Sequence, residues 1–497
     1  MSLTMPEPEK EILRNRAALI DRLRHVVPPD NVIDEETELR AYECDALTMY
    51  RQLPLVVVLP ETVDQVSKIM ALANEMNVKV VPRGAGTSLS GGSLPLGDGI
   101  LLGMAKFNKV LEVDYANRCA VVQPGVTNLA ITHAVEHKGF FYAPDPSSQI
   151  ACSIGGNVGE NSGGVHCLKY GLTTNNLLGL EVVLMDGSVI RLGGKHLDTE
   201  FYDLMGIMTG SEGLLGVITE VTVRILQKPQ TARAVLLGFP SVEAGADCVA
   251  GIISQGIIPG GLEMMDNLAL VAADDFQACG YPREAASLLI CELDGTGAEV
   301  DHLIERVSSI AKNLGASHIQ ISQNDEERQL FWAGRKNAFP AVGAIGPDYL
   351  CMDGTIPRNQ LAHVLTQMQA LSQKHGLRVA NVFHAGDGNL HPLILYDANT
   401  PGETEKAEAL GADILRLCVA VGGVLTGEHG VGVEKRDLMH TMFSETDLKQ
   451  QQRLKCAFDP GHRLNPGKVF PTLHRCAELG HMHVHRGKLP FPDIPRF

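Results

Sequence analysis

The chain has 497 residues, of which 44% are hydrophobic and 20% are charged, and its formal net charge is −16. This length exceeds what a single hydrophobic core supports, so we expect two or more domains. The acidic balance and the lack of a Lys/Arg block argue against nucleic acid or an anionic membrane surface as a natural partner.

The eleven cysteines are scattered and form no Cys-x-x-Cys pair, which argues against an iron–sulfur cluster, a zinc finger and a disulfide framework. Reduced thiols in the cytoplasm are therefore expected. The N-terminal residues carry charges every few positions and contain no signal-peptide core. No later stretch approaches the roughly 18 apolar residues that a membrane-spanning helix needs. We expect a cytoplasmic protein that reaches a membrane only through a partner.

The first predicted elements are a helix and then an alternation of strand and helix. Apolar positions between residues 9 and 27 recur at helical spacing, and this run ends at Pro28-Pro29. Residues 55–81 have the pattern of a strand, an amphipathic helix and a second strand, as in an α/β layer. A glycine-rich segment, residues 82–92, follows directly.

A second unit continues to residue 228. A strand at residues 120–122 precedes a helix over residues 127–139, and two apolar runs around Asp186-Gly187 predict a hairpin. After this unit glycine becomes rarer, and the helical and strand segments become longer. The pattern predicts four parts, with the bounds 1–51, 52–228, 229–470 and 471–497.

The segment PRGAGTSLSGG, residues 82–92, has the composition of a phosphate-binding loop. Its glycines leave backbone N–H groups uncovered, and Thr87, Ser88 and Ser90 add hydroxyl groups, so the loop can wrap a pyrophosphate. Its spacing differs from the dinucleotide fingerprint G-x-G-x-x-G and from a Walker A loop, so NAD and ATP are poorly supported. A lone loop of this kind is more often a surface turn.

At these residues the sequence resembles the FAD-binding family that includes vanillyl-alcohol oxidase and the D-lactate dehydrogenases, in which PRGxGTS binds the FAD pyrophosphate. Further blocks follow in the family's order: PDPSS at 144–148, SIGGNVGENSGG at 153–164, KYG at 169–171 and GSEGLLGVITE at 210–220. The resemblance implies an α+β fold with α/β layers. It has an N-terminal helical lead (1–51), a two-subdomain FAD-binding domain of the vanillyl-alcohol-oxidase type (52–228) and an α/β substrate or cap domain (229–470).

The same resemblance implies which residues bind FAD. Asn157 and Asn161 would offer amide hydrogen bonds to the flavin ring. Some relatives attach FAD through a histidine after the glycine pair, where this chain has Ser93, so FAD is expected to be non-covalent, with His166 as the alternative attachment point. The expected cofactor-binding residues are Pro82, Arg83, Gly84, Ala85, Gly86, Thr87, Ser88, Gly91, Gly92, Pro144, Asp145, Ser147, Ser148, Gly155, Gly156, Asn157, Asn161, Gly163, Gly164, Tyr170, Gly171, Glu212, Gly213, Gly216, Val217 and Ile218.

Two later blocks carry side chains that are typical of a metal site. His384 and His391 lie seven residues apart in HAGDGNLH, and Glu428 and His429 are adjacent in GEHGVG. Two imidazoles and a carboxylate suit a divalent metal, with His429 as the candidate general base. Two isolated histidines more often only pack or donate hydrogen bonds, and the Glu-His pair strengthens the metal hypothesis.

These blocks, with WAGRK at 332–336, are similar to the 2-hydroxy-acid dehydrogenase branch of the family. The resemblance implies that His384, His391 and Glu428 bind a divalent metal, Zn²⁺ or Mn²⁺. It also implies that Arg335 pairs with the substrate carboxylate. Members that act on larger diacids carry a lysine near Cys351 and an asparagine near Leu393, so a small monocarboxylic substrate is expected here.

The last 25 residues and the text around WAGRK resemble the FAD-linked D subunits of bacterial glycolate oxidases. This resemblance implies that glycolate is oxidised to glyoxylate by hydride transfer from C2 to flavin N5, with His429 taking the hydroxyl proton. Electrons would then pass to a second flavin-type subunit and an iron–sulfur subunit, with the tail 471–497 as a partner contact. Two alternatives stay open: a stand-alone D-lactate dehydrogenase, and a flavin electron-relay subunit without chemistry of its own.

Overall fold

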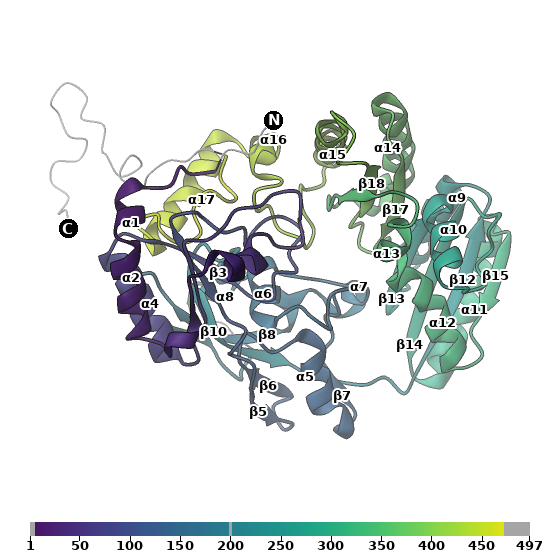
Figure 1. Ribbon diagram of the computed structural model, residues 1–497. Helices are drawn as coiled ribbons and strands as arrows, with labels where there is room; N and C mark the ends of the chain where they lie inside the picture. The colour runs from purple at the N-terminus through teal and green to yellow at the C-terminus, as the bar shows by residue number, and fades with distance from the viewer. Residues whose placement is uncertain (1–4, 198–200, 472–497) are drawn as a thin grey trace, which may run out of the picture.

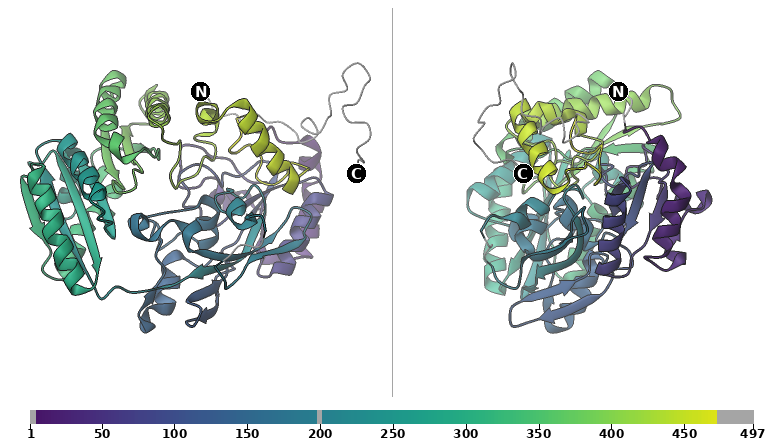
Figure 2. Two further views of the ribbon diagram at one scale, coloured as in Figure 1. Left: turned by 180° about the vertical axis from the view of Figure 1, so that it is seen from behind. Right: turned by 90° about the vertical axis from the view of Figure 1, so that its left-hand side faces the viewer.

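The computed structural model describes residues 5–197 and 201–471, so the tail from residue 472, with its predicted partner contact, lies outside the described residues. The chain forms two lobes, which the views in Figures 1 and 2 separate clearly. The first lobe combines the N-terminal half with the last helices, and the second lobe contains the segments between them.

A four-stranded sheet in the order β1-β2-β4-β3 forms one layer of the first lobe. Strands β2, β4 and β3 are parallel, and α4 (Val63–Glu75) forms the crossover from β2 to β3, which lie on either side of β4. Thr62 caps α4 by accepting a hydrogen bond from the backbone N of Gln65. The predicted strand–helix–strand unit is confirmed. The strands are β1 (Val32–Ile33), β2 (Val56–Val58), β3 (Lys79–Arg83) and β4 (Gly99–Gly103).

The predicted leading helix is present as two helices, α1 (Lys10–Arg14) and α2 (Arg16–Arg24). They are separated at Asn15, whose backbone leaves the helical region with φ −91° and ψ 7°. Both helices share a hydrophobic core with α4 and the parallel sheet through Ile12, Leu19 and Leu23. The helical lead is therefore part of the first lobe's core.

A five-stranded antiparallel sheet, in the order β5-β6-β10-β8-β9, forms the other layer of the first lobe. The predicted hairpin joins β8 to β9 and turns at Gly187, whose φ of +86° favours glycine. Helices α5 (Asn128–Val135) and α6 (Ile154–Glu160) contribute to the same core as the sheet. The strands are β5 (Val110–Asp114), β6 (Cys119–Val122), β8 (Leu177–Val183), β9 (Val189–Gly193) and β10 (Val217–Arg224).

The remaining elements of the first lobe are short. Strands β7 (Phe140–Phe141) and β11 (Leu226–Gln227) pair with each other. The short helices are α3 (Glu36–Leu39), α7 (Cys167–Tyr170) and α8 (Leu204–Met208).

The second lobe is built on an antiparallel sheet in the order β15-β12-β14-β13-β17-β18-β16. Successive side chains of a strand point to opposite faces, and here both faces are buried. On β12, Val235 and Leu237 join one core while Ala234 and Leu236 join another. The strands are β12 (Thr231–Phe239), β13 (Gly261–Asp266), β14 (Ser287–Gly295), β15 (His318–Ile321), β16 (Asp348–Cys351), β17 (Val379–Phe383) and β18 (Pro392–Tyr396).

Helices cover both faces of this sheet, which explains why its central strands are rich in apolar residues. One core takes its helical side chains from α9 (Val242–Ser254), α11 (Gly297–Asn313), α14 (Leu361–His375) and α15 (Glu403–Ala420). The other takes them from α10 (Asn267–Phe276), α12 (Asp325–Lys336) and α13 (Ala338–Val342).

After α15 the chain returns to the first lobe, where α16 (Met439–Met442) and α17 (Glu445–Phe458) lie (Figure 1). The returning chain bonds to β3, because Val80 N donates to Arg463 O and Asn465 N donates to Val80 O. Part of the predicted substrate domain thus packs on the predicted FAD-binding domain. The exact domain bounds stay a prediction.

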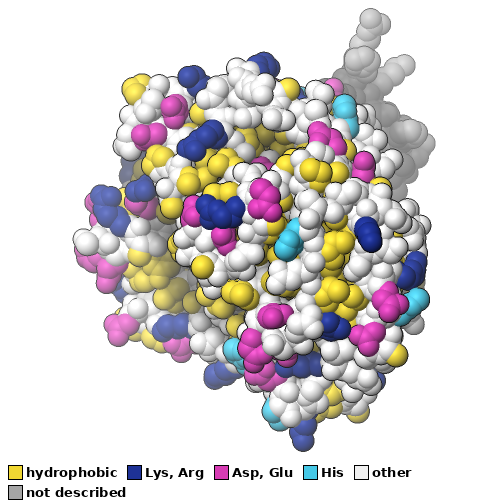
Figure 3. All heavy atoms as spheres, turned by 90° about the vertical axis from the view of Figure 1, so that its right-hand side faces the viewer, with side chains coloured by type: hydrophobic (Ala, Val, Ile, Leu, Met, Phe, Trp, Pro, Cys, Tyr) yellow, Lys and Arg dark blue, Asp and Glu magenta, His cyan; other side chains and the backbone are white. Residues whose placement is uncertain are grey.

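The overall class, an α+β fold of two layered units, is as predicted. On the face of the second lobe in Figure 3, Lys and Arg side chains are interspersed with Asp and Glu, in keeping with the absence of a basic block. Within the described ranges, no helix has the length and apolar character required to cross a membrane.

Candidate active site

A cavity of about 390 Å³ lies along the glycine-rich segment that follows β3. The first lobe supplies most of its wall, and Phe339 of α13 and His391 of the second lobe also line it. Glu428 and His429, from the chain that returns to the first lobe, also line the cavity. One cavity therefore joins the predicted cofactor loop to the predicted reaction centre.

Two glycines of this wall leave no room for a side chain. A Cβ at Gly84 would lie 2.2 Å from Ser153 Oγ, which caps α6, and a Cβ at Gly155 would lie 2.5 Å from the Cβ of Pro124. No side chain fits at either position without displacement. The loop and the start of α6 form a cradle of bare backbone, which suits the approach of a dinucleotide cofactor.

The structure brings most of the predicted cofactor residues to the cavity. Those that line it are Pro82, Arg83, Gly84, Ala85, Gly86, Thr87, Ser88, Gly92, Ser147, Ser148, Gly155, Gly156, Asn157, Glu212, Gly213, Gly216, Val217 and Ile218. Those that do not are Gly91, Pro144, Asp145, Asn161, Gly163, Gly164, Tyr170 and Gly171.

Several of the residues outside the cavity have other contacts. Asn161 ends α6 with a positive φ, and its Oδ1 accepts from Thr174 N. Asp145 Oδ2 lies 2.8 Å from His166 Nδ1, and Tyr170 donates to Asp294 of β14. Tyr170 therefore contacts the second lobe directly, and Asp145 holds His166, which contacts Glu292 of β14.

The three predicted metal ligands converge on one point. His384 follows β17 and His391 precedes β18, and the turn between them passes through Gly388. A Cβ on Gly388 (φ +85°) would lie 2.2 Å from Ile356 O. Glu428 Oε1 is 3.2 Å from His384 Nε2 and 3.3 Å from His391 Nε2. The donor atoms of all three residues lie within 4.8 Å of one another, a spacing compatible with one metal ion.

His384 is held by a carboxylate that lies behind it. Its Nδ1 is 2.7 Å from Glu263 Oε1, on β13, and this contact directs Nε2 toward Glu428. The other oxygen of Glu263 accepts from Arg335 Nε at 2.8 Å, and Arg335 Nη2 forms an ion pair with the same oxygen at 2.8 Å. Arg335 is 2% exposed and does not line the cavity. The predicted substrate-binding arginine thus contacts the residue that orients His384.

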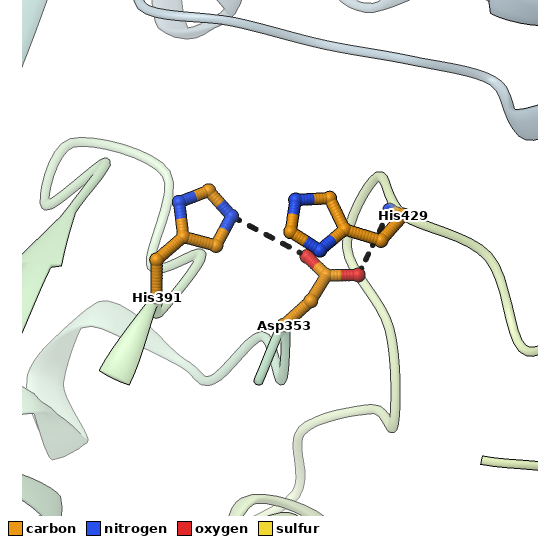
Figure 4. Close-up of side chains that lie close together, drawn as sticks. All are labelled: Asp353, His391 and His429. Atoms are coloured by element: carbon orange, nitrogen blue, oxygen red, sulfur yellow. Dashed lines mark hydrogen bonds and ion pairs between the residues drawn. The ribbon is translucent and has the colours of Figure 1, made fainter. Parts of the chain in front are cut away.

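The loop that carries Glu428 and His429 is organised by Asp353, which follows β16. One or both oxygens of Asp353 accept from the backbone N of Gly427, Glu428 and His429, at 2.9 to 3.3 Å. The ring of His429 stacks on that of His391, with centroids 4.8 Å apart and planes 5° apart (Figure 4). His429 Nδ1 is buried and has no hydrogen-bond partner among the described residues.

Burial and nearby charges set the protonation of this cluster. The pKa of His429 is lowered to about 4, mainly because burial disfavours the charged imidazole. Burial also lowers the pKa of His384, but Glu263 and Glu428 outweigh this effect and raise it well above its usual value. Positive charge is therefore stabilised between the two carboxylates, where a divalent cation can replace the proton.

The sequence interpretation missed several residues of this site. Glu263 interrupts the apolar run GLEMMD, and Asp353 ends the apolar run DYLCMD. An acidic residue in such a run is the signal that would have found both. The cavity wall also includes Cys152 and Phe339, for which no local pattern exists, and Glu160, which stands within the block at 153–164.

Comparisons with known proteins show the family to which the chain belongs. Residues 54–193 match the FAD binding domain, and residues 228–469 match the C-terminal domain of FAD linked oxidases. The fold is that of 4-ethylphenol oxidase from Gulosibacter chungangensis, with a TM-score of 0.79, 18% identity, and coverage of 94% of this chain and 99% of that chain. The chain belongs to the family of FAD-linked oxidases.

Within this family the similarity to glycolate oxidase subunits is high. The chain is 56% identical to glycolate oxidase subunit GlcD of Escherichia coli (strain K12), over 97% of both chains. It is 38% identical to glycolate oxidase subunit GlcD of Bacillus subtilis (strain 168), over 90% of this chain and 96% of that protein. The predicted resemblance is confirmed.

Proposed function

We propose that the protein is an FAD-dependent enzyme that oxidises glycolate, or a 2-hydroxy acid of similar size, to the 2-oxo acid. The observation that carries this proposal is the single cavity that joins the glycine cradle to His391, Glu428 and His429. The names of two relatives, both glycolate oxidase subunits, support glycolate as the substrate. When bound, FAD accepts the hydride that leaves C2 of the substrate.

His384, His391 and Glu428 would hold a divalent metal. The set fits because two buried imidazoles and a carboxylate suit Zn²⁺ or Mn²⁺. Glu263 completes a carboxylate–histidine arrangement of the kind that orients metal ligands. The bound cation would act as a Lewis acid toward the substrate oxygens.

His429 would take the proton of the substrate hydroxyl on its imidazole. The residue belongs to the cavity wall, and its lowered pKa keeps the ring neutral and able to accept a proton. The stacked His391 and the backbone bond to Asp353 hold the ring in place. The role of Arg335 toward the substrate carboxylate stays a prediction, since its Nε and Nη2 already contact Glu263.

Electrons would leave the reduced cofactor through other subunits. The two GlcD relatives are each named as a subunit, which supports a multi-subunit enzyme. We propose a second flavin-type subunit and an iron–sulfur subunit as the partners, with residues 471–497 as a contact and with any membrane association passing through them.

A panel of 2-hydroxy acids tests the proposed function. Under anaerobic conditions glycolate should bleach the flavin absorbance of the purified protein, and 2-hydroxyglutarate should not. Faster bleaching by D-lactate than by glycolate would favour the stand-alone D-lactate dehydrogenase. If no member of the panel bleached the flavin, the protein would be an electron-relay subunit.

FAD should be released intact when the protein is denatured. His166, the alternative attachment point, lies between Asp145 and Glu292, away from the cavity wall. Acid precipitation should therefore give a colourless pellet and a yellow supernatant. A yellow pellet would contradict non-covalent binding. In that case Cys152, which lines the cavity, would be the first residue to test, by Cys152→Ser.

Glu263→Gln should weaken the binding of divalent metal by roughly 10- to 100-fold, the usual effect of losing a carboxylate that orients a ligating histidine. The affinity can be measured by titrating metal-free protein with buffered Zn²⁺ or Mn²⁺. Glu292→Gln is a matched control, because Glu292 is a buried carboxylate on the adjacent strand β14 that contacts His166 and Arg328 instead. Equal metal affinity in both variants would show that Glu263 does not orient His384.

A further inference from the structure

Two buried carboxyl groups lie beside the cavity, outside the proposed metal site. Glu160 is the last residue of α6, and Glu212 lies on the GSEG loop before β10. Both line the cavity, and both face the segment Gly430–Gly432 that directly follows His429. Glu212 is among the expected cofactor-binding residues, but the proposed function gives neither carboxyl group a role in positioning His429.

Glu212 is bound as a carboxylate. Its Oε1 accepts from Val431 N and its Oε2 accepts from Gly432 N, each at 2.7 Å. Donors on both oxygens favour the ionised form of a carboxyl group. The backbone of Gly430–Gly432 packs closely against the glycine-rich loop, since a Cβ on Gly432 would lie 2.2 Å from Ser90 O.

Glu160 lies next to this carboxylate. A Cβ on Gly430 would be 2.1 Å from Glu160 Oε2 and 3.1 Å from Glu212 Oε1, so both oxygens approach the same face of Gly430. Glu160 Oε2 is enclosed and has no hydrogen-bond partner among the described residues. Two ionised carboxyl groups on the same face of Gly430 would repel each other.

The nearby cations are engaged by other groups. Lys435 Nζ bonds to Gly430 O at 2.9 Å and to Glu434 at 2.8 Å, and Lys468 Nζ bonds to Leu94 O and to Asn465. Burial, and then the charge of Glu212, raise the pKa of Glu160 well above its usual value. Burial also raises the pKa of Glu212, but its two backbone donors oppose this effect. A proton shared by the pair therefore belongs on Glu160.

We propose that Glu160 is a protonated carboxyl group that donates a hydrogen bond to the Glu212 carboxylate. This acid pair would position Gly430–Gly432, and thereby His429, against the cavity. Glu160 and Glu212 are thus positioning residues. The inference rests on the proposed function only in the role that it assigns to His429.

Substitutions of the two residues should have opposite outcomes. Glu160→Gln keeps a neutral side chain with a donor, so flavin reduction by glycolate should stay within a few-fold of the wild type. Glu212→Gln places an NH₂ group against a backbone N–H, so the same rate should fall by up to about 100-fold, the cost of a small misplacement of a catalytic group. Glu160→Ala should also slow the reaction, because it removes the donor.

An infrared measurement tests the protonation without any substrate. The oxidised holoenzyme should show a carbonyl band of a protonated carboxylic acid that is missing in Glu160→Gln. Glu181→Gln is a matched control that should leave the band unchanged, since Glu181 is a buried carboxylate that accepts from Thr219 and contacts Arg191. Absence of a band that depends on Glu160, or a Glu160→Gln variant as slow as Glu212→Gln, would overturn the proposal. A normal band in a protein that glycolate does not reduce would contradict only the proposed function.

Discussion

Removal of the divalent metal is expected to abolish flavin reduction by glycolate, and Zn²⁺ or Mn²⁺ should restore it. The cation would neutralise a buried cluster in which Glu428 and Glu263 flank His384. It would also polarise the substrate, which is worth several kcal/mol of transition-state stabilisation. The measurement is the anaerobic bleaching rate before chelation, after chelation and after metal is added back.

Two controls separate loss of the metal from loss of the fold or the cofactor. The FAD content should stay constant through chelation, because none of the three proposed metal ligands belongs to the glycine-rich segment 82–92. Glu428→Gln should reproduce the effect as weakened metal affinity, since it removes a charged ligand. A metal-free preparation with full activity would refute the proposed metal site.

His429→Asn is expected to slow flavin reduction by on the order of 10²–10⁴, the usual contribution of a general base. The variant keeps a polar side chain, and the backbone N of residue 429 can still donate to Asp353, so the loop should stay in place. Single-turnover reduction by glycolate gives the rate, and parallel assays give the FAD and metal contents.

His440→Asn provides the comparison, because His440 is an exposed histidine on α16, in the same returning segment. It should reduce the flavin at the rate of the wild type. If His429→Asn did the same with unchanged metal occupancy, His429 would have only a structural role. The proton acceptor would then have to be sought at His384 or His391, and the metal assignment would be reopened.

Local pattern was enough to predict the parts of the fold in which residues close in sequence determine the structure. The parallel unit around α4 and the hairpin at Gly187 are examples, because helical periodicity and turn chemistry are local properties. The return of residues 463–465 to Val80 could not be predicted in this way. It depends on a pairing between segments that share no local pattern.

The same distinction between local pattern and long-range pairing applies to the residues of the site. His384, His391, Glu428 and His429 stand in two short blocks whose residue types indicate their chemistry, and the structure brings them together. Glu263 and Asp353 are single acidic residues, and their contacts to His384 and to the Glu428 loop join segments that are far apart in the sequence. Tyr170 illustrates the opposite case, since its motif suggested the cofactor while its hydroxyl group bonds across the lobes to Asp294.

The return of the C-terminal chain to β3 has a consequence for synthesis of the protein. Val80 cannot acquire its partners Arg463 and Asn465 until nearly the whole described chain has left the ribosome. The second-lobe sheet, by contrast, is complete by β18, so we expect that lobe to fold first as a contiguous unit. Its compact form would then bring the two flanking segments closer together and lower the entropic cost of closing so long a loop. The first lobe, which begins the chain, would be the last to finish folding.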